Sequence, residues 1–376
     1  MLSADLHICP LVPLDPLPRV TSGLPGTGGR LRTVPEDFEV EELPLYLPAG
    51  DGEHLYLWIE KIDVAADTLR RHLSRALGVP ADAIGMAGMK DKRAVTRQWV
   101  SVPRAAEARV AAVEAPGIRV LEAKLHRNKL RTAHLRGNRF RIRVREAGPD
   151  AARWARARLD LLTAHGCPAF YGSQRMGHGG STLAAGWALA KGVPRMARIG
   201  TPDGVVHQVN LADRSLRRLA ASALQSQVFN CTVARRLADG NLATLLDGEV
   251  CRKVASGGVF VSTDTATDRG RAATGEIEPT GPMWGPKMVR AVGAAGALED
   301  EVLAACGLHL DDFAALGPLA EGTRRPLVVP VTEAGLDAEV DGYTVRFVLP
   351  AGAFATVVLS ELMDGGAADG RTEADA

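Results

Sequence analysis

The sequence has little cysteine and few aromatic residues. Of its 376 residues, 5 are cysteines, and Phe, Trp and Tyr together make up 5%. No two cysteines stand in a Cys-x-x-Cys pair, so neither a zinc ribbon nor a disulfide framework is indicated, and we expect no metal site. Scattered thiols fit a reducing compartment, and we therefore expect a cytoplasmic protein.

Long hydrophobic runs and a large net charge are also missing. No stretch approaches the roughly 18 uninterrupted apolar residues that predict a transmembrane helix, so we expect no membrane partner. The first residues lack the charged and apolar regions of a signal peptide. The formal net charge is +1, which argues against a protein that coats nucleic acid non-specifically.

The length of the chain predicts two domains, since 376 residues exceed one ordinary hydrophobic core. Shifts in composition suggest where the parts begin and end. They are a proline-rich extended arm over residues 1–20, the first part of a main domain over 21–165, an inserted domain over 166–328, the last part of the main domain over 329–364, and an acidic tail over 365–376 that we expect to be disordered.

The segment from Lys124 to Arg145 contains nine Lys or Arg residues and no acid. Its second half, Arg139-Phe-Arg-Ile-Arg-Val-Arg145, alternates as a strand does, with the apolar side chains facing the core and the arginines lining the other face. Neighbouring like charges destabilise a strand unless anions compensate them. RNA phosphates would do so, and carboxylates of neighbouring strands would do so equally well. The candidate contacts to an RNA backbone are Arg139, Arg141, Arg143 and, in a later glycine-rich loop, Arg175.

The most informative stretch is Gly85-Met-Ala-Gly-Met-Lys-Asp-Lys-Arg-Ala-Val-Thr-Arg-Gln-Trp, in which Asp91 is the only acid. Cationic neighbours favour an ionised carboxylate, which can act as a nucleophile or a base. We expect the basic partner that orients Asp91 to be Lys90, Lys92, Arg93 or one of the strand arginines. The alternative is a surface turn whose charges are satisfied by solvent.

Five ordered blocks resemble the TruD family of tRNA pseudouridine synthases, over about Arg30 to Met363. The blocks are Pro35-Glu-Asp-Phe-Glu-Val-Glu-Glu, Gly88-Met-Lys-Asp-Lys-Arg-Ala-Val-Thr-Arg-Gln, Arg136-Gly-Asn-Arg-Phe140, Phe170-Tyr-Gly-Ser-Gln-Arg-Met-Gly, and Phe347-Val-Leu-Pro-Ala-Gly-Ala-Phe-Ala-Thr. The sequence departs from the family pattern at Ala169, Met176 and Ser360, which stand where the family usually has Asn, Phe and Arg. None of these departures touches the Asp91 block.

The resemblance implies an α+β protein with the pseudouridine synthase fold, which is a mixed, largely antiparallel sheet with flanking helices, plus an inserted α/β TRUD domain. It implies isomerisation of a uridine in the D-arm of tRNA, at position 13, with Asp91 as the catalytic carboxylate and no cofactor. tRNA is the partner, no protein partner is implied, and we expect a monomer. The residues expected to bind the substrate are Phe38, Asn138 and Phe354, with Phe140, Lys90 and Arg93 as further candidates.

Simpler roles remain open for several of these residues. Phe140 and Phe354 are equally the kind of side chain that packs in a core, and Asn138 is of a type that caps turns. At the level of the whole chain, a non-catalytic RNA-binding or tRNA-folding module on the same fold is one alternative. A metal-dependent nuclease is another, although Asp82 is the only acid near Asp91 in the sequence.

Overall fold

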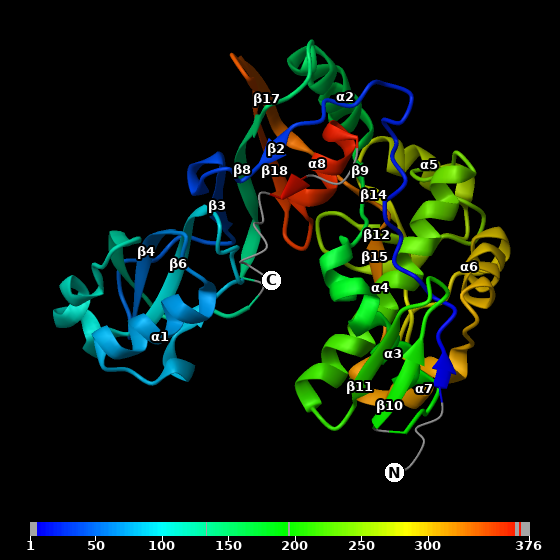
Figure 1. Ribbon diagram of the computed structural model, residues 1–376, viewed down its shortest axis with the longest axis horizontal. Helices are drawn as coiled ribbons and strands as arrows, with labels where there is room; N and C mark the ends of the chain where they lie inside the picture. The colour runs from blue at the N-terminus through cyan, green and yellow to red at the C-terminus, as the bar shows by residue number, and fades with distance from the viewer. Residues whose placement is uncertain (1–5, 133, 195, 365–367, 370–376) are drawn as a thin grey trace. The chain divides into compact units, whose positions relative to one another are not determined.

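The computed structural model describes residues 6–132, 134–194, 196–364 and 368–369 (Figure 1). The tail over 365–376, for which we expect disorder, lies outside these residues except for the short strand β19 (Ala368–Asp369).

The chain divides into two compact units. Unit 1 consists of Met1–Val20 and Cys167–Val329, and unit 2 consists of Thr21–Gly166 and Pro330–Ala376. Unit 2 is therefore assembled from two separate parts of the sequence. It contains all of the candidate site residues except Arg175, which belongs to unit 1.

The centre of unit 2 is one sheet, ten-stranded over the described residues, with the main order β17-β18-β8-β3-β6-β4-β7. Neighbours on this path are antiparallel except β3 and β6, which run parallel. A mixed, largely antiparallel sheet is what the resemblance implies, and the α+β class is confirmed. The bounds are β2 (Arg30–Leu31), β3 (Phe38–Pro44), β4 (His54–Ile62), β5 (Gly85–Met86), β6 (Val95–Pro103), β7 (Ile118–His126), β8 (Leu135–Arg145), β17 (Thr332–Glu339) and β18 (Gly342–Pro350).

Helix α1 (Ala66–Leu77) covers the part of this sheet that holds β4 and β6. Leu69, Leu73 and Leu77 recur at helical spacing, and all are fully buried in a cluster that includes Leu57 and Val100. The helix ends where Gly78 adopts φ +63°, a left-handed conformation that glycine takes without a steric penalty. This packing leaves the last residues of β4 next to the loop that carries Asp91.

Helices α2 (Ala151–His165) and α8 (Ala355–Met363) complete unit 2. The fully buried Arg158 of α2 donates hydrogen bonds to the carbonyl oxygens of Pro25 and Glu361. The Glu361 carboxylate accepts from the backbone N–H and the hydroxyl of Thr21. These bonds hold α8 in place, and Phe354 is the residue that directly precedes its first turn.

Unit 1 combines small sheets with helices. The arm expected to be extended contributes β1 (Leu6–Ile8), which pairs in parallel with β10, and its Cys9 and Leu11 are buried in the core of unit 1. The remaining bounds are β9 (Cys167–Pro168), α3 (Ser181–Ala190), β10 (Met196–Gly200), β11 (Val206–Asn210), α4 (Arg214–Ala238), β12 (Val250–Lys253), β13 (Val259–Val261), α5 (Thr265–Ala273), β14 (Ile277–Met283), α6 (Gly293–Ala305), α7 (Leu310–Leu316), β15 (Thr323–Pro326) and β16 (Val328–Val329).

In the described part of the chain, no single helix is both long and apolar enough to cross a membrane. One pair bent by 74°, Gly293–Ala305 with Leu310–Leu319, meets the length and composition requirements together. Several apolar side chains of this pair, among them Val302 and Phe313, are buried in the core of unit 1. The same described residues hold no group of three or more His, Cys, Asp or Glu side chains that could bind a metal ion.

Candidate active site

The large sheet of unit 2 separates the candidate residues onto two faces. Residues directly opposite each other on neighbouring strands share a face. Asn138 is opposite Glu42 and Leu349, and Phe140 is opposite Val40 and Phe347. We call this side the amide face. The intervening arginines of β8 point to the other side, which we call the arginine face.

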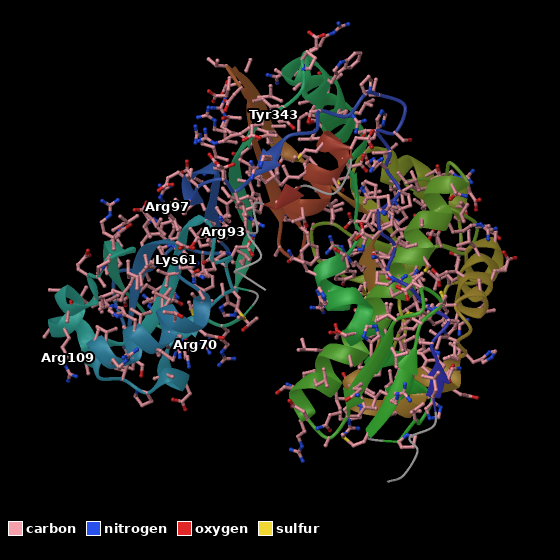
Figure 2. The ribbon with its side chains drawn as sticks, in the orientation of Figure 1. Lys61, Arg70, Arg93, Arg97, Arg109 and Tyr343 are labelled. Carbon is pink, nitrogen blue, oxygen red and sulfur yellow. The ribbon has the colours of Figure 1, made fainter. Side chains whose placement is uncertain are left out.

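A buried lysine holds the Asp91 loop against the end of β4. The ammonium group of Lys61 (Figure 2) donates hydrogen bonds to the carbonyl oxygens of Val64, at 2.7 Å, and Asp91, at 2.6 Å. Lys61 is fully buried, and its burial lowers its pKa to about 8, an effect that the nearby charge of Lys90 reinforces. Lys61 therefore fixes the backbone of the loop and leaves the Asp91 carboxylate free to face outward.

The Asp91 carboxylate forms its ion pair with Arg32. The Arg32 guanidinium lies 2.9 Å from Oδ2 of Asp91 and also stacks over the ring of Phe38, 4.2 Å from the ring centroid. The side chain of Arg32 is 11% exposed, whereas that of Asp91 is 58% exposed. Arg32, which the sequence analysis did not single out, is thus a basic partner of Asp91, and orientation of Asp91 by Lys90, Lys92, Arg93 or a strand arginine stays a prediction.

Lys90 instead turns inward to the amide face. Its ammonium group lies 3.3 Å from the carboxylate of Glu42 and donates a 2.7 Å hydrogen bond to Oδ1 of Asn138. Both Lys90 and Glu42 are almost fully buried, and burial raises the pKa of Glu42 although Lys90 opposes that rise. The structure thus brings Lys90 and Asn138 together. The ion pair of Lys90 with Glu42 orients the amide of Asn138.

The candidate aromatic residues differ in exposure. Phe38 and Phe140 are buried and meet edge to face, with ring centroids 6.3 Å apart, and Phe140 packs on Phe347 at 5.4 Å. Phe354 is 38% exposed. Of these rings Phe354 is therefore the one that offers substantial surface to a ligand, while Phe38 and Phe140 presently serve the core. Contact between any of them and a substrate stays a prediction.

The arginines of β8 are compensated by carboxylates. Arg139 pairs with Glu41 and Glu333, and the hydrogen bond that it donates to Glu333 raises the pKa of Arg139. Arg141 pairs with Glu39, and Arg143 pairs with Asp341, each at 2.9 Å. Pairing with acids of neighbouring strands, which the sequence left open, is thus what the structure contains. Contact with an RNA backbone stays a prediction for all three arginines.

The last two candidates lie on loops. Arg93 is half-buried in the Asp91 loop of unit 2. Arg175 belongs to a short 3-10 helix of unit 1, Ser173–Met176, where it donates a hydrogen bond to the hydroxyl of Ser222 and lies 5.7 Å from the ring centroid of Tyr171. Their predicted contacts with RNA are not tested by these interactions.

Sequence reasoning missed four polar residues of the site, namely Arg32, Glu42, Lys61 and Gln98. Gln98 is fully buried on the face shared with Lys61, and neither its amide oxygen nor its nitrogen has a hydrogen-bond partner among the described residues. A buried unpaired amide costs roughly 1–3 kcal/mol, which proteins tolerate mainly where function needs it. Gln98 is the last residue of the Asp91 block, so the family resemblance could have pointed to it, whereas Arg32 belongs to no motif in the sequence.

Comparison with known proteins identifies the family of the chain. A family model described as tRNA pseudouridine synthase D (TruD) matches residues 18–200 and 195–362. A protein of that name from Anaeromyxobacter dehalogenans is 48% identical over 351 residues, covering 93% of this chain and 97% of its own length. One from Thermus thermophilus is 43% identical over 348 residues, covering 92% of each chain.

A solved structure shares the fold. The crystal structure of a candidate tRNA pseudouridine synthase D from Methanosarcina mazei superposes with a TM-score of 0.73 at 22% sequence identity, covering 93% of this chain and 96% of that one. The family model and the curated relatives together span nearly the whole chain. On these grounds, the chain belongs to the TruD family of tRNA pseudouridine synthases.

Proposed function

We propose that this chain converts a uridine of tRNA to pseudouridine, at position 13 in the D-arm, with Asp91 as the catalytic carboxylate. Membership of the TruD family makes the chain an isomerase of the tRNA pseudouridine synthase class. The single observation that carries the role of Asp91 is its outward-facing carboxylate, which is oriented by Arg32 at 2.9 Å while its backbone is held by Lys61. A charge prepared in this way suits an attack on an electron-poor carbon.

The reaction is an isomerisation and needs no oxidant or leaving group. The bond between N1 of uracil and C1′ of ribose breaks, the base rotates, and a new bond forms between C5 and C1′. The proton of C5 is released, and N1 takes up a proton. Asp91 either adds to C1′, in an ester bond that breaks when C5 attacks C1′, or removes the 2′ proton to give a glycal and returns that proton when C5 bonds to C1′. Both routes require the ionised carboxylate. Arg32 would stabilise that carboxylate in both.

Access to the base requires that it leave its stack, at a cost on the order of a few kcal/mol. Stacking on an aromatic side chain offsets this cost by roughly 1–3 kcal/mol per base. The exposure of Phe354 and the anchoring of α8 support this role for its ring. Because Oδ1 of Asn138 accepts from Lys90, the amide nitrogen is oriented to donate to a carbonyl oxygen of uracil. Phe38 and Phe140 would support this pocket from below.

We further propose that the protein acts in the cytoplasm as a monomer, without a protein partner and without a cofactor. Composition and the balance of the reaction support these statements, since no step in it transfers electrons or phosphate.

The test is tritium release from a tRNA transcript labelled at C5 of uridine, in the presence of EDTA. The parent protein should release tritium, Asp91→Asn should release none, and Asp82→Asn is the matched control that should remain active. Asp82 carries the same charge and lies nearby in the sequence, in the 3-10 helix Ala81–Ala83.

Other outcomes would identify the alternatives. No release by the parent, with tRNA bound equally by the parent and Asp91→Asn, would contradict the proposal and favour a non-catalytic RNA-binding module. Cleavage of the transcript that EDTA abolishes would favour a nuclease.

A further inference from the structure

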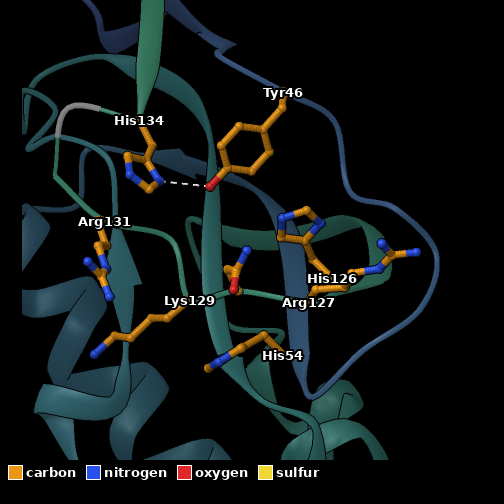
Figure 3. A pocket seen from close by; sticks show the side chains of 8 residues that line it. Tyr46, His54, His126, Arg127, Lys129, Arg131 and His134 are labelled. Carbon is orange, nitrogen blue, oxygen red and sulfur yellow. Dashed lines mark hydrogen bonds between the residues drawn. The ribbon is translucent and has the colours of Figure 1, made fainter.

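A pocket of unit 2 takes no part in the proposed chemistry, and we call it the histidine pocket. Its volume is about 710 Å³, within the range of pockets that bind small ligands. Figure 3 shows that it is surrounded by four rings, those of Tyr46, His54, His126 and His134. The first half of the basic segment, from His126 to His134, supplies most of the remaining lining.

The histidine pocket is remote from Asp91. His54 is the first residue of β4, and Lys61, which bonds to the carbonyl of Asp91, stands seven residues later near its other end. A strand rises about 3.3 Å per residue, so His54 lies roughly 23 Å from Lys61 along β4. A ligand in this pocket cannot be the reacting nucleotide itself.

Three cations line the pocket, and no carboxylate appears in its described lining. Arg127 pairs with Asp51, but both side chains are more than 60% exposed, so this pair contributes little and can exchange partners. Lys129 donates to the main-chain carbonyl of Asp82, and no carboxylate of the described residues pairs with its charge. Arg131 is exposed at the rim. The pocket therefore attracts an anion.

The rings offer both a flat surface and polar atoms. Tyr46 and His126 lie nearly parallel, with centroids 5.0 Å apart, and the hydroxyl of Tyr46 forms a 2.7 Å hydrogen bond with Nδ1 of His134. The backbone N–H of Ala49 donates to Nδ1 of His126, so that nitrogen is unprotonated. Nδ1 of His54 is buried and has no hydrogen-bond partner among the described residues.

The segment that carries the cations is fixed to the sheet before any ligand binds. The hydroxyl of Tyr56 donates to the carbonyl of Asn128 at 3.0 Å, and the backbone N–H of Leu130 donates to the hydroxyl of Ser101 at 2.9 Å. Both Tyr56 and Leu130 are buried in a cluster with Trp99. A preformed site loses less conformational freedom on binding than a flexible loop would.

We propose that the histidine pocket binds one nucleotide of the RNA substrate other than the target uridine. Lys129 and Arg131 would each hold one of the two phosphates that flank it, and the Tyr46–His126 pair would support its base or ribose. This inference rests on the proposed function, because it takes RNA as the substrate. Uncompensated cations beside aromatic rings are the combination that single-stranded RNA requires, and the volume exceeds what one free phosphate would fill.

The test compares Lys129→Gln/Arg131→Gln with the matched control Arg71→Gln/Arg75→Gln. The control removes the same charge from two exposed residues of α1 that do not line the pocket. Binding of an unmodified tRNA transcript is measured between 50 and 200 mM KCl. Loss of two phosphate contacts should reduce the slope of log K against log salt by about 1.4 and weaken binding roughly 10- to 30-fold near 0.1 M salt. The control should change neither.

Kinetics supply the second readout. KM for tRNA should rise in Lys129→Gln/Arg131→Gln, while kcat at saturating tRNA stays at the parent value, since the pocket touches no reacting atom. Arg131→Gln alone, at an exposed position, should keep the parent melting temperature and show about half of the change in slope. These results would support the proposal even if the double variant is less stable.

Three other outcomes would contradict either this proposal or the proposed chemistry. Equal salt slopes for the pocket variant and the control would overturn the proposal. Binding of inorganic phosphate in the pocket at millimolar concentration, with tRNA binding unchanged, would also overturn the proposal and would indicate a small-anion site. Absence of tritium release by the parent, with tRNA binding that still depends on Lys129 and Arg131, would refute the proposed chemistry and leave the pocket as an RNA site.

Discussion

The guanidinium that orients Asp91 comes from 59 residues earlier in the chain. Arg32 is fixed on one side by the ring of Phe38 and on the other by the carboxylate, so it has little freedom to move away when the substrate binds. Arg32→Met should lower kcat by roughly 100- to 1,000-fold, the usual effect of removing one positioned electrostatic partner. Arg32→Lys should recover part of the loss. Tritium release at saturating tRNA measures both, and an unchanged kcat in Arg32→Met would show that Asp91 needs no such partner.

Lys61 gives the stability of the protein a specific dependence on pH. Its pKa falls from the ordinary 10.5 to about 8 in the folded state. Below pH 8 the ammonium is charged in both states, and burial of that charge costs stability in full. Between about pH 8 and 10.5 the unfolded chain binds more protons, so the free energy of unfolding rises with pH.

Relative to Lys61→Met, which lacks this group, the parent should therefore gain up to roughly 3 kcal/mol between pH 7.5 and 10. Urea unfolding of both proteins at several pH values measures the difference, and titration of all other groups cancels in it. A difference that does not change with pH would mean that Lys61 is solvated in the folded state.

Substitution of Phe354 distinguishes a role in binding the base from a role in packing the core. Its ring is 38% exposed, so Phe354→Ala should change the free energy of unfolding by less than about 1 kcal/mol. Loss of a stacked base should lower kcat/KM by roughly 5- to 150-fold. Phe347→Ala is the reference for a core phenylalanine, because Phe347 is fully buried and should cost about 3–5 kcal/mol. Losses of activity and stability in the same proportion would mean that Phe354 serves the core and does not bind the base.

At the scale of elements, α1 stabilises the part of the sheet that ends at Lys61. Leu73 of α1 is fully buried against the apolar side chains of β4 and β6. Leu73→Ala should destabilise the protein by roughly 2–5 kcal/mol, whereas Thr68→Ala on the exposed side of the same helix should cost less than about 0.5 kcal/mol. Denaturant unfolding measures both. Because Leu73 does not touch the site, activity per folded molecule should persist, and its loss would show that α1 also positions the Asp91 loop.

The elements were more predictable from sequence than the site was. The spacing of Leu69, Leu73 and Leu77 is that of a helix, observed as Ala66–Leu77, and the alternation over 139–145 predicted a strand, observed within Leu135–Arg145. Periodicity is a local property, so it is readable without the fold. The partners of the arginines are not local, since Arg139 meets Glu333 from 194 residues away. Arg32 has no pattern around it at all, and its role follows only from the fold that brings it to Asp91.

At the scale of unit 2, the charges fall on distinct surfaces. The amide face holds Lys90 and Asn138, the arginine face holds Arg139, Arg141 and Arg143, and the histidine pocket lies at the far end of β4. An RNA that reacts at Asp91 reaches the arginine face only by passing around an edge of the sheet. Whether those arginines bind RNA or only their carboxylates is therefore a question about the path of the RNA over the unit.

The ion pairs of the arginine face are partly exposed, so phosphate can compete with the carboxylates for them. If it does, Arg141→Gln/Arg143→Gln should weaken tRNA binding and reduce the slope of log K against log salt by about 1.4. Glu39→Gln supplies the opposite change, because it frees Arg141 and should strengthen binding and steepen the slope. A slope that neither variant alters would mean that these arginines serve internal pairs and that the RNA stays on the side of Asp91.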